Sequence, residues 1–197
     1  SMVPSKLNLP VGSSIKVKDA IYALVTKSAN DVAVAMGEHL GGSEENFAKM
    51  MTKKAKSIGM KNTTYRNASG LHDSKQITTA RDQAILARTL IHQYPTQYKY
   101  FARQYFTYMG TTYRNHNRLL ASYKGMDGLK TGYINASGFN LVASAVRDNH
   151  RLIGVVFGGR SSQTRNSHMV NLLDAGFEKM GDLKIAAFDQ APIPEKK

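Results

Sequence analysis

Apolar residues recur at helical spacing through the first half of the chain and form short β-rich runs through the second half. From residue 17 to about residue 40, apolar positions follow a three- and four-residue spacing that is interrupted once, at KSAND. This pattern predicts a helix, a short break and a second helix. The break holds Ser28, Asn30 and Asp31, whose residue types favour helix caps over helix interiors.

Two more helices are predicted before the character of the chain changes. The first begins with Ser43 as N-cap, because two glutamates and a helical stripe follow it, and it ends at Gly59. The residues expected to form the buried stripe are Phe47, Met50, Met51 and Ile58. The second covers TTARDQAILARTLIHQYP, with Thr78 or Thr79 as its cap, and ends before the proline.

The second half of the chain has the pattern of antiparallel strands. QYFTYMGTTYRN predicts a hairpin with Gly110 near its turn, and the runs GLKTGY, FNLVASAVRD and RLIGVVFGG follow, separated by turn signals such as RDNH. SQTRNSHMVNLLDAGFEKM predicts an amphipathic helix on that sheet. We therefore expect one α/β (α+β) domain over residues 1–181, with helices from about 17 to 94, a sheet from about 105 to 158 and a linker or tail over 182–197.

Composition narrows the class of protein. The chain has 197 residues, 42% of them hydrophobic, and no apolar stretch near the roughly 20 residues of a membrane span. A formal charge of +13 first suggests nucleic acid, but no basic run reaches five residues and aromatic residues are not interleaved with the charges. We expect no nucleic-acid partner, since a diffuse positive field suits an anionic membrane face or cell-wall polymer equally well. Cysteine is absent, which excludes a cysteine nucleophile.

Lys130, Thr131 and Gly132 form the first candidate for chemistry. On a strand, lysine would supply positive charge, threonine a hydroxyl for a carboxylate, and glycine a bare backbone against which a substrate could pair. An exposed strand lysine beside a turn glycine explains the same three letters, and three residues alone do not decide between the two.

Ser28-Ala29-Asn30, at the break between helices, favours the functional interpretation of Lys-Thr-Gly over that of an exposed strand lysine. A Ser-x-Asn followed about a hundred residues later by Lys-Thr-Gly occurs in penicillin-binding proteins and class A β-lactamases. The chain resembles the low-molecular-mass penicillin-binding proteins, the serine-type D-alanyl-D-alanine carboxypeptidases of bacterial cell-wall metabolism. IGMKNTTYRNASGLHD, GLKTGYINASGFNLVASAV and LIGVVFGGRSSQTR carry the resemblance, which runs from about residue 9 to 180.

The resemblance implies a β-lactamase/transpeptidase-like fold and assigns catalytic roles. Ser28 resembles the hydroxyl that relays protons near the nucleophile. Asn30 resembles the amide that holds the substrate's acyl side chain and the catalytic lysine. Lys130 would supply positive potential and contact the relay serine.

The substrate-binding residues follow from the same resemblance. Thr131 would bind the terminal carboxylate of the substrate, beside the bare backbone of Gly132. Arg165 resembles the guanidinium that clamps the same carboxylate, a bidentate task that suits arginine. A solvated charge at the start of the last helix is the alternative for Arg165. The implied partners are peptidoglycan stem peptides and β-lactam antibiotics, with no metal or cofactor, in an exported, periplasmic or extracytoplasmic protein.

Two features depart from the family pattern. His116 stands where some relatives have another basic residue, and we expect it to be structural. The family's nucleophile is the serine of a helical Ser-x-x-Lys well upstream of Ser-x-Asn, whereas only 27 residues precede Ser28. Ser13 and Lys16 fit those letters in SSIK, but an extended segment would place them on opposite faces. We therefore expect the nucleophile to lie in a segment missing from this chain.

Two hypotheses follow. The first is a fragment or short form of a D-alanyl-D-alanine carboxypeptidase, which we expect to expose apolar surface and open strand edges that aggregate or form a dimer. The resemblance also implies peripheral membrane association through a missing C-terminal segment. The second is a non-catalytic module that binds peptidoglycan peptides. A class A β-lactamase is disfavoured because no Glu-x-x-Leu-Asn stretch is present.

Overall fold

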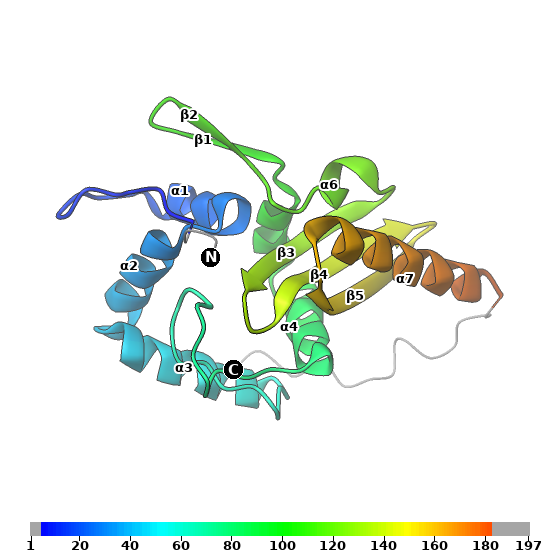
Figure 1. Ribbon diagram of the computed structural model, residues 1–197, viewed down its shortest axis with the longest axis horizontal. Helices are drawn as coiled ribbons and strands as arrows, with labels where there is room; N and C mark the ends of the chain where they lie inside the picture. Colours follow the sequence, from blue (N-terminus) through cyan, green and yellow to red (C-terminus); the bar gives the residue numbers. More distant parts are fainter. Residues whose placement is uncertain (1–4, 183–197) are drawn as a thin grey trace.

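The computed structural model describes residues 5–182, and it centres on a three-stranded antiparallel sheet in the order β3-β4-β5 (Figure 1). A separate hairpin of β1 and β2 projects from one end. The strands are β1 (Tyr105–Tyr108), β2 (Thr111–Arg114), β3 (Met126–Ile134), β4 (Gly138–Arg147) and β5 (His150–Gly159). The α-helices are α1 (Val17–Tyr22), α2 (Asn30–Gly41), α3 (Glu44–Ser57), α4 (Ala80–Gln93), α5 (Pro95–Tyr98), α6 (Leu119–Ser122) and α7 (Ser162–Asp182), with a π-helix η1 (Ala23–Lys27) and a 3-10 helix η2 (Lys99–Ala102). The predicted tail lies, apart from Asp182 at the end of α7, outside the described residues.

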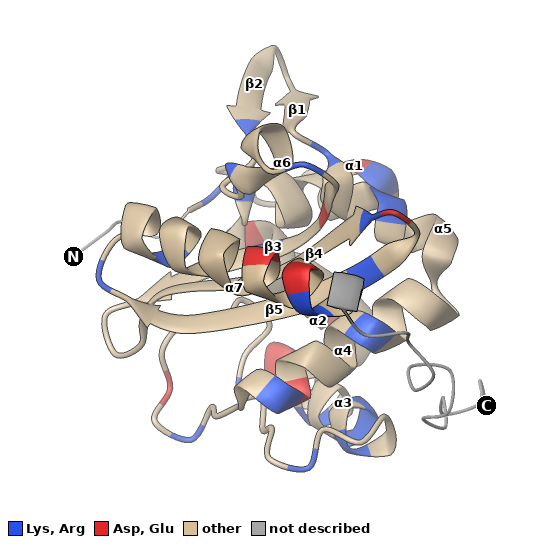
Figure 2. Ribbon diagram, turned by 90° about the vertical axis from the view of Figure 1, so that its right-hand side faces the viewer, with Lys and Arg blue, Asp and Glu red and all other residues tan. Residues whose placement is uncertain are grey.

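The sheet is packed on both faces, as Figures 1 and 2 show with α7 and α4 on opposite sides. Side chains alternate along a strand, so β4 feeds two cores. Leu141 and its odd-numbered neighbours join Met169 and Leu173 of α7 in one core. Val142 packs instead with Ala87 of α4 in the second core. This double packing holds β3, the edge strand that carries the Lys-Thr-Gly motif, in a fixed plane.

The predicted helix, break and helix at the start of the chain are present as α1–η1, a break and α2. Ser28 ends η1 with φ of +58°, in the left-handed region. Neither Ser28 nor Asn30 caps α2, because Ala29 is the N-cap and no side chain satisfies it. Asp31 has a different task, since its carboxylate accepts the backbone N–H groups of Leu7 and Leu9 and ties the start of the chain to α2.

The caps predicted for the next two helices are confirmed. Ser43 accepts a hydrogen bond from the Asn46 backbone N–H at 3.1 Å, and Thr79 accepts one from Asp82 at 3.1 Å. The predicted buried stripe of α3 is wrong at Met50, which is 46% exposed. Phe47 and Met51 are partly buried, and the buried positions of the helix are Ala48 and Ala55.

The single sheet expected from about residue 105 to 158 is two sheets. The hairpin turns at Met109 and Gly110, both with positive φ, and its strands pair only with each other. The reason is Phe106, which is 4% exposed and packs into the core of α1, η1 and α2 rather than beside β3. The three remaining strands pair antiparallel as predicted, and Asp148 and Asn149 form the β4–β5 turn with positive φ.

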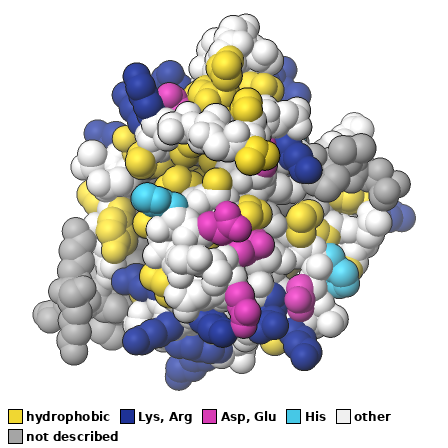
Figure 3. Space-filling view, turned by 90° about the vertical axis from the view of Figure 1, so that its left-hand side faces the viewer, with side chains coloured by type: hydrophobic (Ala, Val, Ile, Leu, Met, Phe, Trp, Pro, Cys, Tyr) yellow, Lys and Arg dark blue, Asp and Glu magenta, His cyan; other side chains and the backbone are white. Residues whose placement is uncertain are grey.

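Basic side chains are spread over much of the surface (Figure 2). Figure 3 shows them gathered along the lower edge of one face, the level at which α3 lies with its exposed Lys53, Lys54 and Lys56. Within residues 5–182, none of the helices combines the length and apolar character that crossing a membrane requires.

Candidate active site

Lys130 and Ser28 are in direct contact. The Lys130 ammonium donates to the Ser28 hydroxyl at 2.8 Å and to the backbone carbonyl of Thr131 at 2.7 Å. Ser28 can meet the strand because it sits in a left-handed conformation at the point where η1 ends. Strained backbone of this kind occurs at functional sites more often than elsewhere. The structure therefore brings together the two motifs, which lie 102 residues apart.

The environment of Lys130 makes its proton unusually labile. Burial and, after it, the positive charge of Arg165 lower the pKa of Lys130 from 10.5 to about 8. A lysine in this range is still mostly charged at neutral pH, yet it exchanges a proton far more readily than a surface lysine. The Lys130–Ser28 pair can thus hold a positive charge or pass a proton through the hydroxyl.

Arg165 is a buried cation, 4% exposed, in the first turn of α7. The turn is fixed by reciprocal bonds between Ser161 and Thr164. The guanidinium donates to the side-chain oxygen of Asn166 at 2.8 Å and to the Asn140 carbonyl at 3.4 Å. Burial lowers the pKa of Arg165.

Neither cation has an acidic partner within the described part of the chain, where the ion pairs all involve other residues. Arg165 and Lys130 lie close enough for the arginine charge to depress the lysine pKa. The like charges of the buried Arg165 and the half-buried Lys130, with no counter-ion among the described residues, destabilise the free protein and are relieved when an anion binds between them. The arrangement suits a carboxylate.

Thr131 and Gly132 connect the two cations. Thr131 is 8% exposed on β3, and Gly132 pairs with Asn140, whose carbonyl accepts from Arg165. A Cβ built on Gly132 would meet nothing closer than the Asn140 Cβ at 4.0 Å. The fold itself does not require glycine there, so the bare backbone is open to a ligand.

A cavity of about 570 Å³ begins at Gly132. The ends of β3, β4 and β5 form one wall, and the segment of residues 65–78 between α3 and α4 forms the other. Exposed apolar side chains line both walls, namely Leu71, Ile77, Tyr133 and Phe157. The cavity therefore continues the β3 edge away from Lys130.

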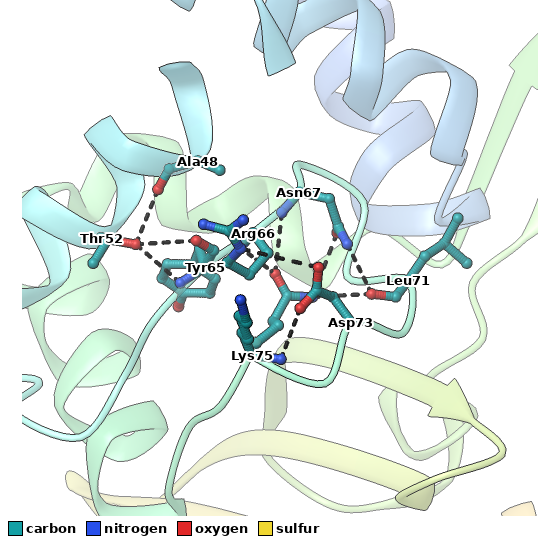
Figure 4. A network of polar contacts seen from close by, with 9 residues as sticks. Ala48, Thr52, Tyr65, Arg66, Asn67, Leu71, Asp73 and Lys75 are labelled. Atoms are coloured by element: carbon teal, nitrogen blue, oxygen red, sulfur yellow. Dashed lines mark hydrogen bonds and ion pairs between the residues drawn. The ribbon is translucent and has the colours of Figure 1, made fainter. Parts of the chain in front are cut away.

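The segment of residues 65–78 is held by a dense polar network (Figure 4). The Gln76 side-chain oxygen accepts from the backbone of Arg66 at 2.8 Å, while Asn67 donates to the Leu71 carbonyl at 2.8 Å. The Thr52 hydroxyl accepts from the Tyr65 backbone at 2.9 Å and joins this segment to α3. Such bonding keeps the cavity wall in place without regular secondary structure.

The remaining predicted positions lie around this centre. Asn30 donates its backbone N–H to the Ser5 carbonyl at 2.8 Å, and within residues 5–182 no side-chain hydrogen bond of Asn30 reaches Ser28 or Lys130. Ser13 lies in the segment before α1, exposed, and donates its hydroxyl to the Pro10 carbonyl at 2.7 Å. Ser13 and Lys16 are therefore not on a common helical face.

His116 lies near the cations of the site, with its residue surface largely exposed and its ring partly desolvated. Desolvation of the ring and the charges of Lys130, Lys27 and Arg118 lower the pKa of His116. The imidazole is therefore biased toward its neutral form, which adds no positive charge to the site.

Sequence reasoning missed a polar cluster at the start of β3. Arg151 of β5 donates to both carboxylate oxygens of Asp127, at 2.8 and 2.9 Å, and to the Ser144 hydroxyl at 2.6 Å. Tyr98 donates to the same carboxylate at 2.9 Å, and burial is the main cause that raises the Tyr98 pKa. A lone arginine in the apolar run RLIGVVFGG was the available signal.

Comparison with known proteins places the chain in one family. Ser28 of the Ser-x-Asn motif and Lys130 of the Lys-Thr-Gly motif are in contact, as the resemblance noted from the sequence implies. A family model described as D-alanyl-D-alanine carboxypeptidase matches residues 2–161, and the chain belongs to that family. The resemblance noted from the sequence is thereby confirmed.

Relatives and solved structures agree with this placement. The D-alanyl-D-alanine carboxypeptidase DacF of Bacillus subtilis is 39% identical over 185 residues, covering 91% of this chain and 47% of the relative. Penicillin binding protein 5 of Haemophilus influenzae superposes with a TM-score of 0.85 at 36% identity, over 88% of this chain and 51% of that one. Penicillin-Binding Protein D2 of Listeria monocytogenes, solved with ampicillin bound, has a TM-score of 0.81 at 30% identity, over 90% and 74%. The chain spans about half the length of the curated relatives it matches.

Proposed function

We propose that the chain forms the substrate-carboxylate and proton-relay part of a serine-type D-alanyl-D-alanine carboxypeptidase that acts on peptidoglycan stem peptides. The observation that carries this proposal is the Lys130–Ser28 hydrogen bond of 2.8 Å, with a buried Arg165 near it. A carboxypeptidase must recognise a free C-terminus, and Arg165 and Lys130, which have no acidic partner among residues 5–182, would supply that recognition.

The free carboxylate of the terminal D-alanine would bind Thr131 and Arg165. The peptide would then run along the edge of β3 past Gly132, and the residues upstream of the scissile bond would enter the cavity beside residues 65–78. This direction is supported by the open space at Gly132 and by the cavity that starts there.

The reaction is acyl transfer. A serine hydroxyl attacks the carbonyl of the D-Ala-D-Ala amide, the C–N bond breaks, and the leaving nitrogen takes a proton to release D-alanine. Water then hydrolyses the ester. We assign Ser28 as the hydroxyl that carries the proton to the leaving nitrogen, Lys130 as its charged partner, and Asn30 as the amide that holds the acyl arm.

We propose that this chain does not supply the nucleophilic serine. Ser13 is the only serine in the chain with a lysine three residues later. Its hydroxyl bonds to Pro10 and its segment precedes α1, so Lys16 has no helical path to its proton. Full activity then requires a helical Ser-x-x-Lys from elsewhere.

The second candidate is a binding module of the same fold, without catalysis. The same observation about Ser13 favours it for this chain taken alone, because the residues proposed to bind the carboxylate are present whereas Ser13 bonds to Pro10 and not to Lys16. We further propose β-lactam antibiotics as ligands of the complete site and an extracytoplasmic location. A dimer formed through the open strand edges and peripheral membrane association stay predictions from the sequence.

The experiment is a fusion of this chain to an upstream helical segment that carries Ser-x-x-Lys, assayed for D-alanine release from a D-Ala-D-Ala peptide. Release is expected, with losses of about a hundredfold or more in Lys130→Met and Arg165→Met. A folded fusion that forms a penicillin adduct but is indifferent to both substitutions would contradict the roles assigned here.

A further inference from the structure

Two buried asparagines, Asn115 and Asn117, lie in the connection between β2 and α6. They are 3% and 2% exposed, although asparagine is mostly found at the surface. A buried amide must satisfy two donors and an acceptor, so its partners show which parts of the protein it joins.

Each asparagine makes one local bond with its oxygen. The Asn115 side-chain oxygen accepts from the Asn117 backbone N–H at 2.8 Å, and the Asn117 oxygen accepts from the Leu119 N–H at 3.2 Å. These two consecutive turns fix the shape of the connection. They leave both side-chain amide groups pointing to other elements.

The amide groups reach the two halves of the candidate site. Asn115 donates to the carbonyls of Arg103, at 2.8 Å, and of Val25, at 3.4 Å. Val25 belongs to η1, the element that ends at Ser28. Asn117 donates at 3.4 Å to the carbonyl of Gly128, two residues before Lys130 on β3.

We propose that Asn115 and Asn117 are positioning residues that set the distance between Ser28 and Lys130. The bonded path runs from η1 through the two asparagines to β3, and the Lys130–Ser28 bond of 2.8 Å closes it into a ring. This role rests on the proposed function of that pair. The asparagines touch no substrate and act through the two elements they join.

Replacing each asparagine with serine tests the proposal, because it keeps the hydrogen bond to the backbone two residues on and removes the one to η1 or β3. A serine hydroxyl can still accept from the backbone two residues on, but it is too short to reach Val25 or Gly128. The readout is the Lys130 pKa in the 197-residue chain, followed through its side-chain carbon resonances in a pH titration. We expect a value of about 8 in the native sequence and a rise of at least about half a unit in Asn115→Ser and Asn117→Ser, because the loosened site admits water.

Asn46→Ser is the matched control, since among the described residues the side-chain amide of Asn46 donates only to the Gly41 carbonyl at the end of α2. It should leave the Lys130 pKa unchanged whatever it does to the melting temperature. Folded Asn115→Ser and Asn117→Ser variants with the native Lys130 pKa would overturn the proposal.

A second measurement tests the proposal even if both asparagine variants fail to fold. Ser28→Ala removes the bond that closes the ring at a partly exposed residue and should leave the fold intact. We expect it to shift the side-chain amide resonances of Asn115 and Asn117. If Ser28→Ala moves the Lys130 resonances and leaves both asparagine amides in place, the coupling does not exist. Loss of the carboxylate-binding function would appear separately, as a failure to bind peptide in the native sequence.

Discussion

The ammonium of Lys130 donates a hydrogen bond to the hydroxyl of Ser28 at 2.8 Å, so β3 and the end of η1 share one polar centre. The lysine is also held by the Thr131 carbonyl and is depressed in pKa by burial and by Arg165. A charge kept in such a place lowers stability in the free protein, and function is the common reason for retaining it. The stability of the protein and its binding of a carboxylate should therefore both depend on the charge of Lys130.

Lys130→Met should stabilise the chain at neutral pH. Folding lowers the Lys130 pKa from 10.5 to about 8, so the penalty is fully present below pH 8 and fades as the pH rises toward 10.5. After the lost hydrogen bonds are discounted, we expect a gain of about 1–2 kcal/mol at pH 7 that shrinks at pH 10. Urea unfolding at both pH values measures it, with Lys53→Met as an exposed control. An equal gain at the two pH values would refute the linkage.

Gly132→Ala should leave folding intact and weaken peptide binding. The nearest atom to a methyl group at this position is 4.0 Å away, so we expect a stability change within about 0.5 kcal/mol. Gly154→Ala, on β5 of the same sheet, is the matched contrast, because its Cβ would meet the Met169 sulfur at 2.5 Å. Thermal melts and peptide titrations should show opposite patterns for the two variants.

Asp31→Asn should loosen the start of the chain. Burial alone would raise the Asp31 pKa, but the N–H groups of Leu7, Leu9 and Val32 outweigh it and lower the pKa. The stabilisation is thus present above the usual carboxyl pKa and is lost as the pH falls through the depressed one. Hydrogen exchange at Leu7 and Leu9 should accelerate in Asp31→Asn at pH 7, whereas Glu45→Gln should leave both amides unchanged.

The 197-residue chain should form no covalent adduct with a penicillin. Ser13, which alone has a lysine three residues later, lies outside a helix, and removing the nucleophile from a catalytic unit commonly costs about a millionfold in rate. Intact-mass spectrometry after prolonged incubation is the measurement. A stoichiometric adduct would show that the chain holds its own nucleophile, and its mapping to Ser13 would identify the residue.

Sequence patterns predicted most of the elements because their causes are local. The caps Ser43 and Thr79 and the β4–β5 turn each depend on a few neighbouring residues. The separation of the β1–β2 hairpin from the main sheet could not be foreseen. It depends on Phe106, which packs into the core formed by α1, η1 and α2, segments distant in the sequence.

In the candidate site, too, some contacts were expected before the structure and others were not. The Lys130–Ser28 contact was expected through family resemblance, because no pattern links positions 102 residues apart. Asn115 bonds to Val25 across 90 residues, and Arg151 bonds to Asp127 across 24, without any periodicity that marks them. Buried polar partners are fixed by tertiary packing, and short-range propensity carries little information about them.

The most direct test of the account is a titration of the chain with an N-acetylated Lys-D-Ala-D-Ala peptide, followed in amide and side-chain NMR spectra. The control is the same peptide with its C-terminus amidated, which removes only the carboxylate. We predict shifts at Lys130, Thr131, Gly132 and Arg165 with the free acid, an upward shift of the Lys130 pKa on binding, and neither change with the amide. Equal responses to acid and amide, or a response to the acid that bypasses Lys130 and Arg165, would contradict the claim that these two cations form a carboxylate site.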